Sequence, residues 1–217
     1  MKKQIPNLFT LLNLFFGCIA IVFALQTENI NIYINEESAT SFNLPESLSY
    51  ASILLFTAAL VDFLDGFVAR LFKADSAMGK QLDSLADVVS FGVAPGVILY
   101  QLLRMSFMKE ENGLNVSIGW LLPAFIFTCA GAYRLARFNL DTTQVYGFKG
   151  VPIPAAGLVV ASLPLIYWYS NSDFIYNLIL NKWFLYSLII LLKWLAVPVI
   201  FIAYILLSLA LKNKTTT

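Results

Sequence analysis

Residues 61–95 read VDFLDGFVARLFKADSAMGKQLDSLADVVSFGVAP, and the four aspartates at Asp62, Asp65, Asp83 and Asp87 decide what this apolar stretch can form. Asp62 and Asp65 are three residues apart, and Asp83 and Asp87 are four apart, so each pair shares one face of a predicted helix. The short linker makes the two helices antiparallel neighbours, so the acidic faces can meet. Carboxylates at membrane depth are costly and face a partner or a cavity. The stretch therefore predicts two membrane helices that bring four carboxylates together.

The simplest partner for four converging carboxylates is one or two divalent cations. Ligation by oxygen alone suits Mg²⁺ or Mn²⁺. Two such ions, about 3.5–4 Å apart, are suited to an in-line displacement at phosphorus. We therefore expect Asp62, Asp65, Asp83 and Asp87 to be metal ligands. The sequence leaves the choice between Mg²⁺ and Mn²⁺ open.

The composition indicates an all-α, polytopic integral membrane protein with a single domain over residues 1–217. Of the 217 residues, 59% are hydrophobic and 12% are charged, whereas soluble domains carry about 25% charged residues. Several apolar runs approach or exceed the length of about 20 residues that crosses a bilayer. We expect six transmembrane helices, the last kinked at Pro198, over residues 8–25, 48–72, 79–103, 118–137, 155–169 and 183–211.

The distribution of charge predicts the orientation in the membrane. Basic residues concentrate in the loops on the cytoplasmic side of membrane proteins. With six spans, ten of the 14 Lys and Arg residues fall on the side of the N-terminus. We therefore expect both termini and the four aspartates to face the cytoplasm, at the plasma or inner membrane. The net charge of +1 gives no indication of nucleic-acid binding, and the absence of histidine restricts a general base to a carboxylate, Lys, Tyr or Cys.

Small and basic residues lie between the aspartates. Gly66 and Ala69 are on or beside the face of Asp62 and Asp65, where they leave room for a ligand. Small residues also let membrane helices pack closely, so packing is the alternative explanation. Arg70 ends the helix, either as an anchor in the headgroup region or as a clamp for a phosphate.

Together these residues resemble the signature of the CDP-alcohol phosphatidyltransferase family, D-x2-D-G-x2-A-R-x8-G-x3-D-x3-D. All eight fixed positions match, at Asp62, Asp65, Gly66, Ala69, Arg70, Gly79, Asp83 and Asp87. The resemblance implies that the four aspartates bind two divalent ions, which hold the diphosphate of a CDP-linked lipid such as CDP-diacylglycerol. It also implies that Asp87 is the general base toward the incoming alcohol, and that the protein is a homodimer among membrane lipids.

The resemblance further assigns residues to the CDP-lipid. It implies that Gly66, Arg70 and Ser76 contact the nucleotide. The segment IPNLFT, residues 5–10, is similar to the PN-x2-T start of the family's first helix, which adds Asn7 and Thr10. An ordinary N-cap and first helical turn is the alternative for these two residues.

Two later segments bear on the acceptor alcohol. GAYRLARFNL, residues 131–140, and FKGVPIPAAG, residues 148–157, resemble the branch of the family that uses L-serine. Arg134 and Arg137 share a helical face and could receive the carboxylate of serine, with Asn139 and Lys149 assisting. An ordinary cluster of cytoplasmic basic residues is the alternative. An acceptor that carries a phosphate, such as glycerol 3-phosphate or inositol phosphate, would also suit basic residues.

Two other classes of membrane protein share some of these features. Membrane prenyltransferases also use aspartates and Mg²⁺ on diphosphates, but they have more helices and two separated Asp-rich segments. Transporters place acidic residues along ion pathways, and many contain internal repeats. Here all four aspartates fall in one short segment and no repeat is apparent. Both classes are therefore disfavoured.

Overall fold

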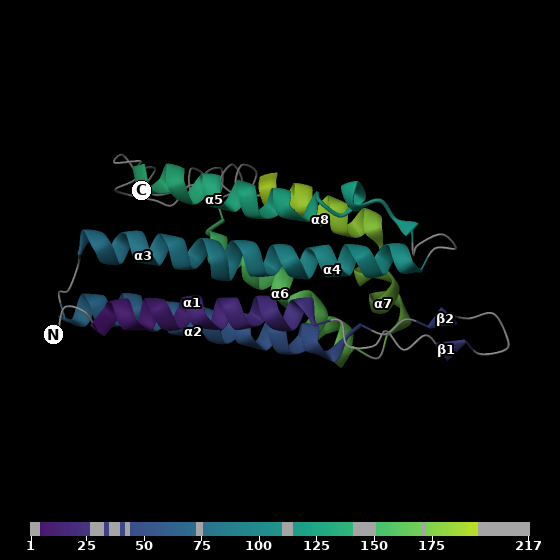
Figure 1. Ribbon diagram of the computed structural model, residues 1–217, viewed down its shortest axis with the longest axis horizontal. Helices are drawn as coiled ribbons and strands as arrows, with labels where there is room; N and C mark the ends of the chain where they lie inside the picture. The colour runs from purple at the N-terminus through teal and green to yellow at the C-terminus, as the bar shows by residue number, and fades with distance from the viewer. Residues whose placement is uncertain are drawn as a thin grey trace, which may run out of the picture.

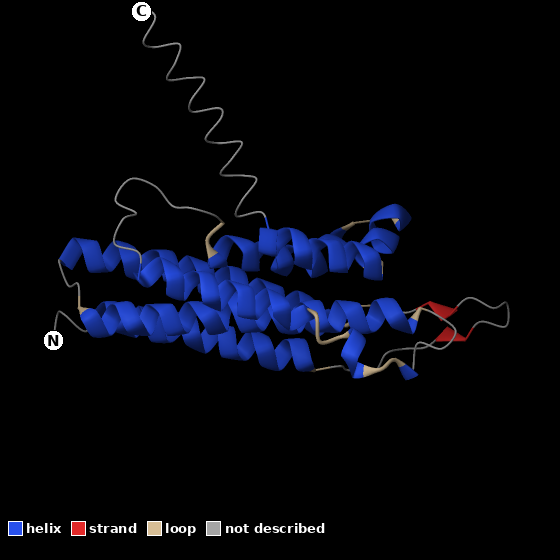
Figure 2. Ribbon diagram, turned by 90° about the horizontal axis from the view of Figure 1, so that it is seen from above, coloured by secondary structure: helices blue, strands red, loops and turns tan. Residues whose placement is uncertain are grey.

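The computed structural model describes residues 5–26, 33–34, 40–41, 44–72, 76–109, 115–140, 151–170 and 172–194. These residues are helical apart from short connections and two antiparallel strands of two residues each, β1 (Tyr33–Ile34) and β2 (Thr40–Ser41) (Figure 2). The all-α prediction is thus confirmed. The helices are α1 (Ile5–Leu25), α2 (Glu46–Phe72), α3 (Ala77–Asp87), η2 (Val88–Val93), α4 (Ala94–Met108), η4 (Ile118–Trp120), α5 (Ala124–Leu140), α6 (Ile153–Tyr169), α7 (Asp173–Ile179) and α8 (Lys182–Trp194).

Three helices in the described part of the chain are long and apolar enough to cross a membrane. They are Pro6–Leu25, Glu46–Phe72 and the continuous helix Ala77–Met108, which α3, η2 and α4 form together. A bent pair, α7 with α8, would make a fourth span, although its two helices meet at 62°. The described residues therefore support a membrane protein with three or four such spans, and the predicted number of six stays a prediction. Pro198 and the predicted end of the last helix lie outside the described residues.

One predicted helix differs from the structure, and the structure contains one helix that was not predicted. The span expected at 118–137 begins instead as the short 3₁₀ helix η4, and the α-helix α5 starts only at Ala124, directly after Pro123. Helix α7 was not predicted at all. Between α7 and α8, Asn181 Oδ1 accepts hydrogen bonds from the backbone N–H of Trp183 at 2.9 Å and of Phe184 at 3.3 Å. This side-chain cap begins α8 and explains why the helix is interrupted between α7 and α8.

The long helix of α3, η2 and α4 occupies the centre of the molecule. Helices α1 and α2 lie side by side on one flank, and α5 and α8 lie on the other (Figure 1). Small residues let these helices approach closely. A Cβ on Gly17 of α1 would lie 2.8 Å from Ser90 Cα, and a Cβ on Gly157 of α6 would lie 2.7 Å from Phe91 O. Both contacts are made to η2, which is thereby fixed from two sides.

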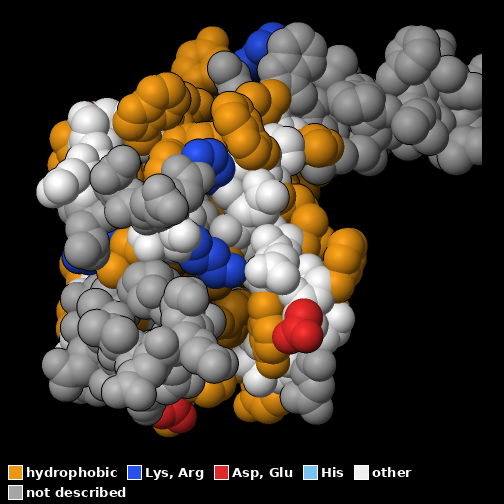
Figure 3. All heavy atoms as spheres, turned by 90° about the vertical axis from the view of Figure 1, so that its right-hand side faces the viewer, with side chains coloured by type: hydrophobic (Ala, Val, Ile, Leu, Met, Phe, Trp, Pro, Cys, Tyr) orange, Lys and Arg blue, Asp and Glu red, His pale blue; other side chains and the backbone are white. Residues whose placement is uncertain are grey.

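The end of the molecule that carries the β-strands presents a mixture of side chains. Basic and acidic groups stand among hydrophobic ones on this face (Figure 3). Lys182 at the start of α8 has its Nζ 5.1 Å from the centre of the Phe107 ring, a cation–π arrangement. The four aspartates lie on the last three turns of α2 and on the second half of α3, and the end of α2 and the start of α3 are at the opposite end of the molecule from the β-strands (Figure 1).

Candidate active site

Helix α1 presents two polar side chains to the aspartates of α2. Thr10 Oγ1 donates to Asp65 Oδ2 at 2.8 Å, and Asn13 Nδ2 donates to Asp62 Oδ1 at 3.0 Å. Each pair of residues is three apart in its helix, so the two hydrogen bonds follow one another along the α1–α2 interface. Thr10 is 4% exposed and Asn13 is fully buried. Both donors are neutral, so they orient the carboxylates without compensating their charge.

Three of the four predicted metal ligands converge. Carboxylate oxygens of Asp62, Asp83 and Asp87 lie within 4.8 Å of one another. Asp87 Oδ1 is buried and has no hydrogen-bond partner among the described residues. Mg²⁺ and Mn²⁺ prefer oxygen ligands, and an unpartnered buried oxygen calls for a partner. The three side chains therefore fit a divalent cation.

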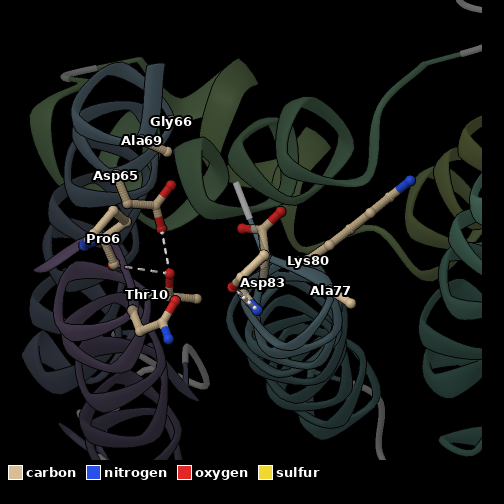
Figure 4. Close-up of a pocket in the computed structure, with 11 residues that line it drawn as sticks. Pro6, Thr10, Asp65, Gly66, Ala69, Ala77, Lys80 and Asp83 are labelled. Atoms are coloured by element: carbon tan, nitrogen blue, oxygen red, sulfur yellow. Dashed lines mark hydrogen bonds between the residues drawn. The ribbon is translucent and has the colours of Figure 1, made fainter. Parts of the chain in front are cut away.

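A pocket of about 480 Å³ opens beside these carboxylates. Asp65 and Asp83 face it from opposite sides, while the Lys80 side chain extends away from Asp83 (Figure 4). Asp65 is thus a pocket residue rather than a member of the converging group, and Asp83 belongs to both. The start of α1, the end of α2 and the start of α3 with its cap provide the lining: Pro6, Asn7, Thr10, Asp65, Gly66, Ala69, Ser76, Ala77, Gly79, Lys80 and Asp83.

Four of the five residues predicted to contact the CDP-lipid line this pocket. They come from three segments of the chain, and they are Asn7, Thr10, Gly66 and Ser76. A Cβ on Gly66 would have no atom within 4 Å, so the glycine leaves open space. The fifth residue, Arg70, does not line the pocket. Its side chain is exposed, and its Nε donates to Gly66 O at 3.0 Å.

The start of α3 is held against α1 at the pocket. Ser76 is the N-cap, and its Oγ accepts from the Gly79 N–H at 2.9 Å. A Cβ on Gly79 would lie 2.9 Å from both Ser76 Oγ and Asn7 Oδ1, so only glycine allows this approach without a shift. The π-helical turns of η2 begin directly after Asp87, and π-helical insertions are frequent at functional sites.

The predicted acceptor residues are not gathered in the pocket. Arg134 is half-buried on α5 and lines a separate cavity of about 30 Å³, whereas Arg137 is exposed. Asn139 Nδ2 donates to Ser84 Oγ at 2.8 Å, which ties the end of α5 to α3 beside Asp83. Lys149 lies outside the described residues. A role for these four residues in acceptor binding stays a prediction.

Sequence reasoning missed Asn13. Its partner Asp62 is 49 positions further along the chain, so spacing could not reveal the contact. The available signal was its type, since it is a lone amide in the apolar run FTLLNLFFG, three residues after Thr10. Polar residues inside membrane helices form hydrogen bonds to neighbouring helices.

Comparison with known proteins identifies a family whose model covers the segments that form this site. The family model for CDP-alcohol phosphatidyltransferase matches residues 3–199. The CDP-diacylglycerol–serine O-phosphatidyltransferase of Helicobacter pylori (strain J99 / ATCC 700824) is 39% identical over 163 residues, which are 74% of this chain and 57% of that protein. The Bacillus subtilis (strain 168) protein of the same name is 35% identical over 126 residues, which are 57% of this chain and 65% of that protein.

An archaeal relative also matches. The archaetidylserine synthase of Methanothermobacter thermautotrophicus is 39% identical over 127 residues, which are 58% of this chain and 50% of that protein. The chain thus spans between half and two thirds of the length of these relatives. The match to the family model covers most of the chain and includes all four aspartates and the pocket beside them. The chain therefore belongs to the CDP-alcohol phosphatidyltransferase family.

Proposed function

We propose that this protein transfers the phosphatidyl group of CDP-diacylglycerol to the hydroxyl of L-serine, giving phosphatidylserine and CMP. The observation that carries the proposal is the position of the three converging carboxylates directly beside the pocket, with Asp83 common to both. A diphosphate needs compensation of its charge, and a nucleotide needs a cavity next to it. The names of the relatives favour serine as the acceptor over glycerol 3-phosphate or inositol phosphate.

Two divalent cations, Mg²⁺ or Mn²⁺, would be held by Asp62, Asp65, Asp83 and Asp87. When bound, they would supply electrostatic stabilisation for the diphosphate and the departing phosphate. Thr10 and Asn13 keep Asp65 and Asp62 oriented for that purpose. Because the two donors are neutral, they leave the charge of the carboxylates to be compensated by a cation.

The chemistry is a direct displacement at the lipid-side phosphorus. Asp87 takes the proton of the serine hydroxyl, for which a carboxylate with an unpartnered oxygen is well suited. The serine oxygen forms a bond to phosphorus, and the bond from phosphorus to the bridging oxygen breaks. That oxygen leaves with CMP. No covalent intermediate on the protein is needed.

The chain's other residues act in binding. Asn7, Gly66 and Ser76 line the pocket and would contact the nucleotide, while Arg70 at the exposed end of α2 would approach its phosphates. On α5, Arg134 and Arg137 with Asn139, and Lys149 in the segment that follows, would bind the serine carboxylate and its polar groups. A forked guanidinium is well matched to a carboxylate.

The membrane arrangement extends the same proposal. The protein would have six spans, with the aspartates at the cytoplasmic side of the plasma or inner membrane, because basic residues concentrate on that side. CDP-diacylglycerol would reach the site from the cytoplasmic leaflet while its acyl chains stay among the lipids. Two copies of the chain would form a homodimer. Accessibility labelling in membranes tests the number and orientation of the spans, and cysteine cross-linking tests the homodimer.

The experiment for the activity is an assay of CMP release by the purified protein with CDP-diacylglycerol, Mn²⁺ and labelled serine. We expect CMP to form together with labelled phosphatidylserine. Parallel reactions contain glycerol 3-phosphate or inositol phosphate in place of serine. Faster CMP release with either alcohol would contradict the choice of serine. Absence of CMP release with all three alcohols would contradict the proposed activity as a whole.

A further inference from the structure

The side-chain amide of Asn13 is fully buried, and its nitrogen and its oxygen differ in their hydrogen bonding. It is 0% exposed in the middle of α1, and its Nδ2 donates to Asp62 Oδ1 at 3.0 Å. Its Oδ1 is buried and has no hydrogen-bond partner among the described residues. Buried acceptors are nearly always paired in native proteins, so an unpaired one calls for an explanation. Here the amide belongs to the same hydrogen-bonded unit as a carboxylate of the converging group.

The backbone of Asn13 is also fixed. Ser90 Oγ, in the π-helical segment η2, donates to Asn13 O at 3.1 Å. One turn further along α1, Gly17 permits the close approach, since a Cβ there would lie 2.8 Å from Ser90 Cα. Asn13 therefore connects η2, which directly follows Asp87, to Asp62 on α2. Through it, α2, which carries Asp62, and the helical segment that directly follows Asp87 share one support.

We propose that Asn13 is a positioning residue for divalent-cation binding. Its amide holds the Asp62 carboxylate in the orientation in which it converges with Asp83 and Asp87, and its free Oδ1 accepts a hydrogen bond from water that enters with the cation. This inference rests on the proposed function, which assigns a cation to these carboxylates. Residues that orient metal ligands commonly change metal affinity 10- to 100-fold when they are replaced.

The competing explanation is that Asn13 only joins two membrane helices, as buried amides often do. Gln101 offers a matched control for that role. It is 3% exposed, and its Nε2 donates to the carbonyl oxygen of Ala24 on the same helix α1 at 2.9 Å. It is not among the residues of the aspartate group or the pocket. Its replacement removes a buried helix-joining amide without touching the carboxylates.

The experiment measures Mn²⁺ binding to the full chain, purified in detergent and free of substrate, by electron paramagnetic resonance. We expect Asn13→Leu to raise the Kd for Mn²⁺ 10- to 100-fold. We expect Gln101→Leu to leave that Kd within twofold of the unmodified protein, although both variants lower the melting temperature. Equal Mn²⁺ affinity in Asn13→Leu and the unmodified protein would overturn the proposal, as would an equal loss of affinity in both variants.

Asn13→Asp keeps the shape of the side chain and replaces the donor by an acceptor, so it covers the case in which Asn13→Leu does not fold. The added carboxylate opposes Asp62, so we expect a lower melting temperature without metal and a larger rise on adding Mn²⁺. An unchanged melting temperature and an unchanged Kd would overturn the proposal. If the unmodified protein itself bound no Mn²⁺, the proposed function would fail instead, so the two failures are distinguishable.

Discussion

Thr10 and Asp65 are joined across the α1–α2 interface by a 2.8 Å hydrogen bond from the hydroxyl to Oδ2. Asp65 is only 7% exposed, and yet it lines the pocket, as Thr10 does. All four aspartates are fixed positions of the family signature. In the structure, however, Asp65 accepts its hydrogen bond from Thr10 of α1, a helix that lies outside the signature. Thr10 thus determines how this carboxylate faces the pocket.

Thr10→Val tests that relationship because it removes the donor and keeps the shape. A hydrogen bond to a charged group contributes roughly 1.5–3 kcal/mol, so we expect kcat/KM for CDP-diacylglycerol to fall roughly 10- to 100-fold. Initial rates of CMP release provide the measurement. Ser52→Ala is the control, since Ser52 Oγ is buried and donates only to Leu48 O within α2. If both variants lost the same activity, general destabilisation would be the better explanation.

Gly66→Leu tests whether the glycine serves the pocket or helix packing. A Cβ added at Gly66 would have no atom within 4 Å, so a side chain fits the fold and fills the pocket. We expect the melting temperature to stay the same or rise, because glycine is about 1 kcal/mol less favourable than alanine in a helix. We expect the KM for CDP-diacylglycerol to rise at least tenfold.

Gly157→Ala is the opposite case. A Cβ there would lie 2.7 Å from Phe91 O, so this glycine is required for packing of α6 against η2. We expect a clear fall in melting temperature for Gly157→Ala. A similar fall in melting temperature for Gly66→Leu would indicate that Gly66 serves helix packing, which is the alternative that the sequence left open.

The local part of the site was predictable, and the reason is helical periodicity. Asp62 and Asp65 lie on one helix, and Asp83 and Asp87 on the next, so spacing alone places each pair on one face. The linker between α2 and α3 is short, so the two faces had to be neighbours. Spacing could not show that Asp65 turns toward Thr10, because that choice depends on α1, 55 positions away.

The fold was predictable to a similar degree. The spans of α1, α2 and the long central helix follow from runs of apolar residues, and all three predictions agree with the structure. The break between α7 and α8 depends on one capping side chain, Asn181, in a sequence that is apolar on both sides. The start of α8 at Lys182 agrees with the predicted start at residue 183, and only the short α7 in the expected connection was missed.

Asp83→Asn should abolish CMP release, with a loss of at least a thousandfold. Asp83 is the one described residue that belongs both to the converging carboxylates and to the pocket lining. The amide keeps the shape and removes the charge on which cation binding depends. Asp173→Asn, at the start of α7, is the control and should retain activity. Ordinary activity in a folded Asp83→Asn protein would rule out the assignment of this site.

Arg134→Ala should weaken the use of serine more than the use of the CDP-lipid. Arg134 is on α5 beside a cavity of about 30 Å³ and is not part of the pocket between α1, α2 and α3. We expect the KM for serine to rise at least tenfold while the KM for CDP-diacylglycerol changes less than twofold. Arg104→Ala, exposed on α4, provides the control. An unchanged KM for serine would favour an ordinary cytoplasmic basic cluster.

Removal of divalent cations should lower both activity and stability. The converging carboxylates of Asp62, Asp83 and Asp87 repel one another without a cation, and a ligand that binds only the folded state stabilises it. We expect EDTA to abolish CMP release and to lower the melting temperature, and Mn²⁺ or Mg²⁺ to restore both. In Asp83→Asn, where one of the repelling charges is gone, EDTA should lower the melting temperature much less. A melting temperature that falls equally in both proteins would place the stabilising cation away from these carboxylates.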